Sequence, residues 1–100
     1  MNTLKSNNLP YYLNAMGATV VMWASPQCKL CKQQLDQVDF EKLGGIGYEF
    51  LYIDGHNWDS LCDEWDIKRF PTYMVFNQHT EIIERVEYNE FNKLEEIWKH

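Results

Sequence analysis

The segment of residues 19–53 restricts the fold most, because a helical pattern stands there between two short apolar runs. Residues 19–23 form a continuous apolar run with β-branched side chains, which is typical of a strand buried on both faces. Residues 28–43 are rich in good helix formers, and residues 48–53 repeat the buried-strand pattern. A strand, a helix and a second strand in this order predict two parallel strands joined by a helical crossover.

The other segments extend this pattern in both directions along the chain. Residues 58–65 predict a short helix after a turn. The β-rich runs 72–76 and 82–88, with a polar segment between them, predict an antiparallel hairpin. Residues 89–100 carry apolar side chains at helical spacing, and residues 9–16 predict an opening helix. The sequence thus predicts an α/β protein with the element order (α)βαβαββα.

Length and composition are those of a globular protein with one core. The 100 residues are a usual domain size, 45% of them are apolar, and no repeat or linker divides them, so we expect one domain over residues 1–100. No window approaches the roughly 18 uncharged apolar residues of a membrane span. With nine basic and fifteen acidic residues, no basic surface is expected for a nucleic acid. The polar N-terminus lacks a secretory signal pattern, and we expect a cytoplasmic monomer.

Three cysteines are the main candidates for chemistry. Cys28 and Cys31 form a CxxC motif, and Cys62 stands apart from them. A structural disulfide framework uses an even and dispersed set of cysteines, whereas a CxxC motif in a reducing compartment indicates redox chemistry or a metal site. Composition and spacing leave both of these alternatives open.

The residues around the CxxC motif resemble the active-site strand and helix of thioredoxins, and they read VVMWASPQCKLCK over residues 20–32. A second match, LYID at residues 51–54 followed by WDIKRFPTY at residues 65–73, is similar to the family's central strand, third helix and cis-proline loop. The sequence distance between the CxxC motif and the Pro-Thr pair also agrees with the family. The resemblance covers residues 19–100, and together with the element order it makes the CxxC motif a specific signal.

The resemblance implies the thioredoxin fold, in which helices flank a central mixed four-stranded sheet. It implies a thiol-disulfide oxidoreductase that reduces or exchanges protein disulfides through a Cys28–Cys31 pair, with a reductase as electron donor and no other cofactor or metal. It also implies a cis peptide bond before Pro71 and a partner-binding loop that includes Phe70 and Thr72.

The start of the predicted helix assigns different roles to the two cysteines of the motif. Cys28 stands where unpaired backbone N–H groups and the helix dipole stabilise a thiolate. Lys29 and Lys32 should stabilise this anion further and lower the thiol pKa. Cys31 lies one turn later, near enough to attack a mixed disulfide and release the reduced partner. We therefore expect Cys28 to be the nucleophile and Cys31 the resolving cysteine.

Several positions depart from the thioredoxin pattern. Gln27 precedes the first cysteine, and the two residues inside the motif differ from the usual Gly-Pro, so the redox potential cannot be carried over. Val21 and Phe50 stand where the family commonly has a buried aspartate and a facing lysine, which removes the usual proton shuttle for the resolving thiol. Glu87 stands where a glycine usually lines the substrate groove.

A glutaredoxin-like, glutathione-dependent reductase is an alternative within the same fold. Glutaredoxins bind glutathione with a Gly-Gly-Asp-like segment after the hairpin, and the corresponding residues 86–90 read VEYNE, without Gly-Gly. Glutathione dependence is therefore the second choice among enzymatic functions.

Two alternatives need no redox turnover. A zinc site would use a Cys3His set, for which the candidates are Cys28, Cys31, His56 and Cys62. A scaffolding module with a thioredoxin fold would instead present exposed aromatic side chains, for which the candidates are Tyr11, Tyr12 and Trp58.

Overall fold

The computed structural model describes residues 1–99. Among these residues, no helix has both the length and the apolar character needed to cross a membrane. In chain order the elements are β1 (Asn2–Thr3), α1 (Leu9–Met16), β2 (Thr19–Ala24), α2 (Lys29–Gln37), α3 (Phe40–Gly45), β3 (Glu49–Asp54), α4 (Asp59–Glu64), β4 (Thr72–Phe76), β5 (Ile82–Val86) and α5 (Phe91–Glu95).

The strands form one mixed sheet with the order β1-β3-β2-β4-β5. The central strand β2 runs parallel to β3 and antiparallel to β4, and all six of its residues are buried. β5 pairs with β4 in the antiparallel direction. The predicted α/β class, the parallel pair with its helical crossover and the antiparallel hairpin are therefore confirmed.

The sheet has one strand more than the four that were predicted. β1 pairs in parallel with β3, with Asn2 opposite Leu51 and Thr3 opposite Tyr52, and the Leu4 backbone N–H continues the pairing to the Tyr52 carbonyl at 3.0 Å. Both residues of β1 are exposed, so the strand is held by backbone hydrogen bonds and has no apolar pattern. A periodicity argument cannot detect a strand of this kind.

The predicted single helix over residues 28–43 is wrong, because the chain forms two helices there. Val38 adopts an extended conformation with φ −73° and ψ 126°, and the Asp39 carboxylate accepts the Lys42 backbone N–H at 3.0 Å. Aspartate is a preferred N-cap, so Asp39 begins α3 instead of continuing α2. The helix predicted over residues 89–100 is also shorter in the structure, where α5 spans Phe91–Glu95. Residue 100, the end of the predicted range, lies outside the described residues.

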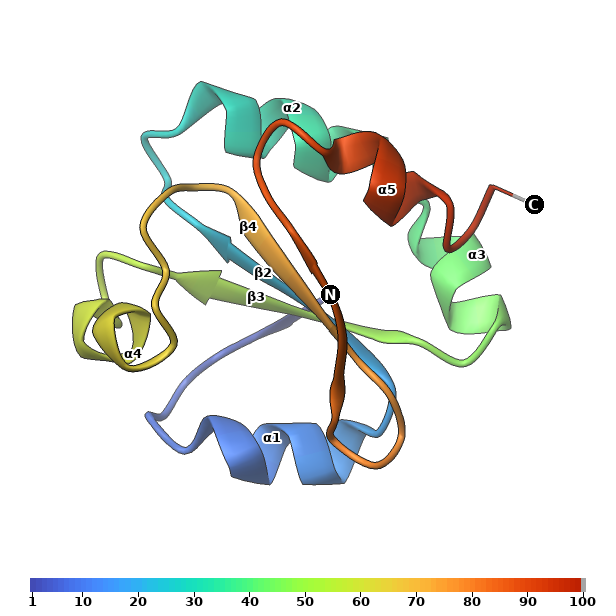
Figure 1. Ribbon diagram of the computed structural model, residues 1–100, viewed down its shortest axis with the longest axis horizontal. Helices are drawn as coiled ribbons and strands as arrows, with labels where there is room; N and C mark the ends of the chain where they lie inside the picture. The colour runs from blue at the N-terminus through green and yellow to red at the C-terminus, as the bar shows by residue number, and fades with distance from the viewer. Residues whose placement is uncertain (100) are drawn as a thin grey trace.

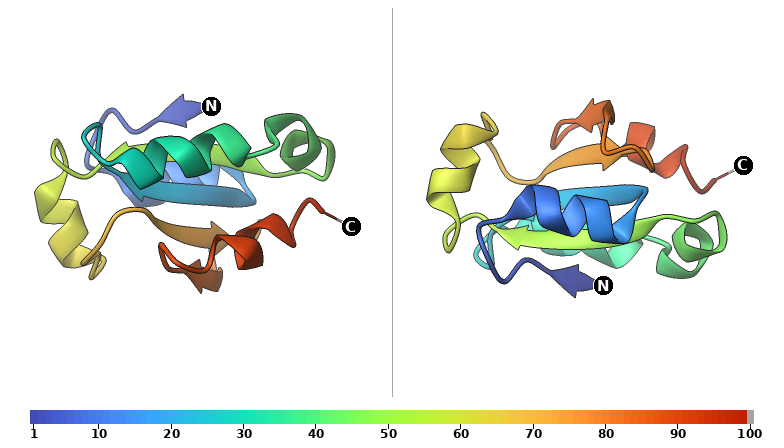
Figure 2. Two further views of the ribbon diagram at one scale, coloured as in Figure 1. Left: turned by 90° about the horizontal axis from the view of Figure 1, so that it is seen from above. Right: turned by 90° about the horizontal axis from the view of Figure 1, so that it is seen from below.

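Helices cover both faces of the sheet (Figures 1 and 2). Val21 and Trp23 of β2 pack in one apolar cluster with residues of α1 and α4. Val20 and Met22 pack on the opposite face, in a second cluster with residues of α2, α3 and α5. The alternation of side chains along β2 therefore supplies both halves of the core.

Two functional segments meet at one end of the central strand. The CxxC motif follows the carboxyl end of β2 after a short loop, and the Phe70-Pro71 pair directly precedes β4. Because Trp23 pairs with Thr72 in the antiparallel register, the cysteine loop and the proline loop leave the sheet at the same end.

Candidate active site

Cys28 and Cys31 lie in the first turn of α2. Cys28 is the N-cap of this helix, and its Sγ accepts the Cys31 backbone N–H at 3.1 Å. The Cys28 N–H donates to the Ser25 carbonyl at 3.1 Å, which closes the turn between β2 and α2. The two cysteines form a disulfide, and their Cα atoms are 5.2 Å apart. When the pair is reduced, the helix N-terminus at Cys28 favours the thiolate.

The two sulfur-bearing residues differ in their access to solvent. Cys31 is only 2% exposed and belongs to the apolar cluster under α2, whereas Cys28 is half-buried. Cys28 is therefore the more accessible cysteine of the pair. Lys29 and Lys32 follow the two cysteines directly in sequence, and both are exposed.

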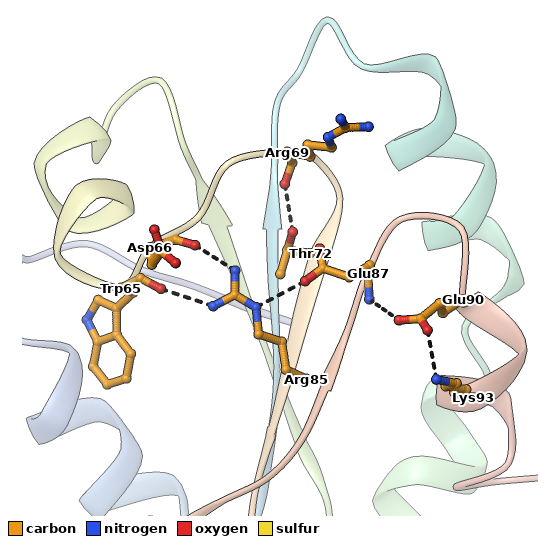
Figure 3. Close-up of polar contacts among 8 residues, drawn as sticks. All are labelled: Trp65, Asp66, Arg69, Thr72, Arg85, Glu87, Glu90 and Lys93. Atoms are coloured by element: carbon orange, nitrogen blue, oxygen red, sulfur yellow. Dashed lines mark hydrogen bonds and ion pairs between the residues drawn. The ribbon is translucent and has the colours of Figure 1, made fainter.

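The Phe70–Pro71 peptide bond is cis and lies beside the disulfide. The Phe70 carbonyl oxygen is 3.8 Å from Cys28 Sγ. Thr72 is fully buried, and its hydroxyl donates to the Arg69 carbonyl at 2.7 Å (Figure 3). Pro71 is also buried and Phe70 is half-buried. The Phe70 carbonyl thus lies on the disulfide side of the loop, and the Thr72 hydroxyl holds the shape of the loop.

Gly55 makes room for the Phe70 ring. A Cβ atom at Gly55 would clash with the Phe70 ring, so any larger residue there would push the ring away. The ring also contacts His56, with 6.3 Å between the ring centroids. The sequence predicts only a turn for this segment, because a tertiary contact of this kind leaves no local signal.

A buried hydrogen-bond chain connects α2 with β4. The Tyr73 hydroxyl donates to Gln34 Oε1 at 2.7 Å, and Gln34 Nε2 donates to the Tyr88 carbonyl at 2.8 Å. Tyr73 is fully buried and Gln34 is 5% exposed, and burial raises the pKa of the Tyr73 phenol well above its ordinary value. The chain fixes the cysteine helix relative to the strand that follows Pro71.

Arg69 and Tyr88 pair at the edge of this site. The Arg69 guanidinium lies 5.3 Å from the centre of the Tyr88 ring, and its Nη1 donates to the Tyr88 hydroxyl at 3.1 Å. Because Gln34 holds the Tyr88 carbonyl, the pair is anchored to α2 as well as to the proline loop. Neither residue is among the site residues predicted from the sequence.

Arg85 connects the loop after α4 with the segment after β5 (Figure 3). Its guanidinium donates to the Asp66 carbonyl at 2.6 Å and to the Trp65 carbonyl at 3.3 Å, and it pairs with Glu87 at 3.2 Å. Asp66 has a positive φ of 56°, so the chain turns sharply there before it reaches the proline loop. Arg85 thus satisfies carbonyl groups that the end of α4 leaves without helical partners.

Replacing Arg85 with glutamine should destabilise the protein by about 1 kcal/mol, because charge-assisted hydrogen bonds to the end of α4 are lost. Urea denaturation would measure the difference in the free energy of unfolding. Lys42→Gln is the matched control, because Lys42 is exposed and a surface change of this kind stays within about 0.5 kcal/mol. Equal unfolding midpoints for the two variants would show that Arg85 does not stabilise the loop.

No carboxylate takes the place of the family's buried acid within residues 1–99. The buried polar side chains there are those of Thr19, Ser25, Gln34 and Thr72. Val21 and Phe50 are both buried, and they belong to apolar clusters on opposite faces of the sheet. A proton from Cys31 therefore has no buried carboxylate to receive it in this part of the chain.

The proposed zinc ligands are not brought together. Among residues 1–99, no three His, Cys, Asp or Glu side chains are close enough to hold a metal ion. Cys62 is buried with its Sγ 3.9 Å from the Gly55 carbonyl oxygen, and burial is the main cause of the raised pKa of its thiol. His56 is exposed.

Of the three aromatic candidates for a scaffolding surface, one is exposed and two are half-buried. Tyr12 and Trp58 pack against the apolar cluster of α1 and α4, and Tyr11 is 59% exposed. Single exposed aromatic residues are common on monomeric proteins and do not define an interface.

Comparison with known proteins finds similarity in structure alone. No protein-family model and no curated protein sequence matches this chain. The thioredoxin NaTrxh from Nicotiana alata matches with a TM-score of 0.79 and 21% identity, over 96% of this chain and 87% of that one. Fasciola hepatica thioredoxin matches with a TM-score of 0.79 and 19% identity, over 100% of this chain and 99% of that one. Thioredoxin f from spinach chloroplast matches with a TM-score of 0.80 and 18% identity, over 98% of this chain and 89% of that one. The chain therefore has the thioredoxin fold, as the resemblance predicted.

Proposed function

We propose that this chain is a thiol-disulfide oxidoreductase that reduces or exchanges disulfides of partner proteins. The observation that carries the proposal is the pairing of an accessible Cys28, at the N-terminus of α2, with a buried Cys31 within disulfide distance. The Phe70 carbonyl lies 3.8 Å from Cys28 Sγ, so an extended partner chain can bind the loop backbone while its disulfide meets Cys28. A cytoplasmic, monomeric protein recharged by a reductase belongs to the same proposal.

The reaction needs two exchange steps. Cys28 as a thiolate attacks one sulfur of the partner disulfide, a Cys28–partner bond forms, and the other partner sulfur leaves and takes a proton. Cys31 then attacks Cys28 Sγ, the Cys28–Cys31 disulfide forms, and the partner leaves as a dithiol. Two electrons pass from the cysteine pair to the partner. Since no carboxylate is buried beside Cys31 within residues 1–99, the Cys31 proton passes to the leaving thiolate or to water.

A redox titration tests this proposal. The protein is equilibrated in glutathione buffers of graded potential, its free thiols are counted, and the reduction of insulin disulfides is assayed with dithiothreitol as reductant. We expect two thiols to titrate together in one reversible two-electron transition, and insulin reduction to exceed the rate with dithiothreitol alone. Cys62→Ala is the control, because Cys62 is buried and its loss should leave the transition in place. Thiols that never titrate as a pair would exclude the proposal.

A further inference from the structure

The basic residues of this acidic chain divide into those that form ion pairs and those that do not. Of the nine Lys and Arg residues, four form ion pairs with carboxylates, namely Lys68, Arg85, Lys93 and Lys99. The other five form none with carboxylates of residues 1–99. Three of those five lie around the disulfide: Lys29, Lys32 and Arg69. We call these three residues the cationic rim.

The cationic rim comes from the two segments that meet at Cys28, namely the start of α2 and the proline loop. Lys29 and Lys32 are three residues apart on α2, a spacing that puts them on neighbouring positions of the helix surface. Arg69 precedes Phe70, whose carbonyl oxygen is 3.8 Å from Cys28 Sγ. The Arg69 side chain points toward α2 (Figure 3), where Tyr88 is held by Gln34. All three rim residues are exposed.

Two of the neighbouring carboxylates form ion pairs with other basic residues. Glu87 pairs with Arg85 at 3.2 Å, and Glu90 pairs with Lys93 at 2.7 Å. The Asp54 carboxylate accepts the His56 backbone N–H at 2.9 Å. Glu87 and Glu90 are therefore paired away from the rim, whereas the backbone contact of Asp54 leaves its charge in place, and the whole chain carries a net charge of −6. A local potential of opposite sign to the net charge selects the face and the partner in diffusional encounters.

The Arg69 side chain is held in place with N–H donors free to bind a carboxylate. One guanidinium nitrogen donates to the Tyr88 hydroxyl, and the guanidinium carbon lies over the Tyr88 ring, 5.3 Å from its centre. A guanidinium has five N–H donors in a fork that matches a carboxylate, so donors are left for a partner. The hydroxyl and the aromatic ring hold the side chain without cancelling its charge.

We propose that the cationic rim selects partner disulfides that are flanked by acidic residues. This inference rests on the proposed oxidoreductase function and names its substrate class. A partner segment with Asp or Glu beside its cysteine meets Arg69 of the proline loop and the two lysines at the start of α2. A lysine-flanked disulfide meets like charges at the same place.

The test uses three synthetic peptides that contain the same disulfide loop, flanked by glutamates, glutamines or lysines. Pre-reduced protein is mixed with each peptide, and the second-order rate constant of peptide reduction is measured at low and at high salt. We expect the glutamate peptide to react about tenfold faster than the lysine peptide at low ionic strength. The advantage should shrink toward twofold or less at about 0.5 M salt, where the Debye length falls to a few ångströms.

Variants separate selection by charge from other effects. Arg69→Glu should reverse the preference between the glutamate and lysine peptides, and Arg69→Gln should reduce it roughly threefold. Lys42→Gln is the matched control, because it removes one exposed positive charge on α3, and it should leave the preference unchanged.

The possible failures are distinguishable. If none of the peptides is reduced, the oxidoreductase function fails and the inference fails with it. If all three are reduced at equal rates, or if Arg69→Glu changes all three rates by the same factor, the oxidoreductase function stands and selection by the cationic rim is overturned.

Discussion

Replacing Cys31 with serine should convert the protein from a catalyst into a trap that stays covalently bound to its substrate. Cys28 remains able to attack a partner disulfide, because it is half-buried at the start of α2. The second step is lost, because serine cannot attack a mixed disulfide. Incubation with insulin and mass analysis under non-reducing conditions should show the variant plus one insulin chain, whereas the native protein should show almost no adduct.

Cys28→Ser is the decisive counterpart of this variant. It should lose insulin reduction by more than about a hundredfold and form no adduct, because the remaining Cys31 is only 2% exposed and lacks the N-cap position. Cys62→Ala should behave like the native protein in both measurements. An adduct formed by Cys28→Ser, or normal turnover by Cys31→Ser, would contradict the assigned roles.

The central strands could be predicted from the sequence because both of their faces are buried. A continuous apolar run, as in Thr19–Ala24, is the direct signature of such a strand. β1 carries no such signature, since both of its residues are exposed and it is held by backbone pairing. The break between α2 and α3 depends on the capping side chain of Asp39. Good helix formers stand on either side of Asp39, and they led to the prediction of one continuous helix.

The site was predictable only where a motif marks it. The CxxC pair and the Pro71 loop stand at a recognisable spacing, whereas Arg69, Tyr88 and Arg85 act through partners that are distant in sequence. Gln34 left a weak signal. Cys31, Gln34 and Val38 share the buried side of the helix, and a polar residue there needs a hydrogen-bond partner.

Gln34→Leu should lower the free energy of unfolding by about 2–4 kcal/mol, because it removes the acceptor of one buried group and the donor to another. The Tyr73 hydroxyl and the Tyr88 carbonyl both lose their partner. Urea denaturation would give the value. Gln33→Leu is the matched control, since Gln33 is exposed on the same helix and its replacement should change the stability by less than about 0.5 kcal/mol.

A double-mutant cycle tests whether Gln34 and Tyr73 act together. Tyr73→Phe alone leaves Gln34 Oε1 without its 2.7 Å donor and should cost about 1–2 kcal/mol. In the double variant neither member of this hydrogen bond is present, so the loss should fall short of the sum of the single losses by about 1 kcal/mol. Strictly additive losses would show that the bond contributes nothing to stability.

Burial of Tyr73 should also give the protein a pH dependence on the alkaline side. Burial raises the pKa of Tyr73 above its ordinary value of 10.0, so near and above pH 10 the unfolded chain releases the phenolic proton while the folded chain keeps it. The folded state then binds more protons than the unfolded state, and the free energy of unfolding falls as the pH rises. Below pH 10 this contribution is complete. Unfolding measured between about pH 8 and 11 should show a smaller decline for Tyr73→Phe than for the native protein, and identical declines would mean that Tyr73 ionises as readily in the folded chain as in the unfolded one.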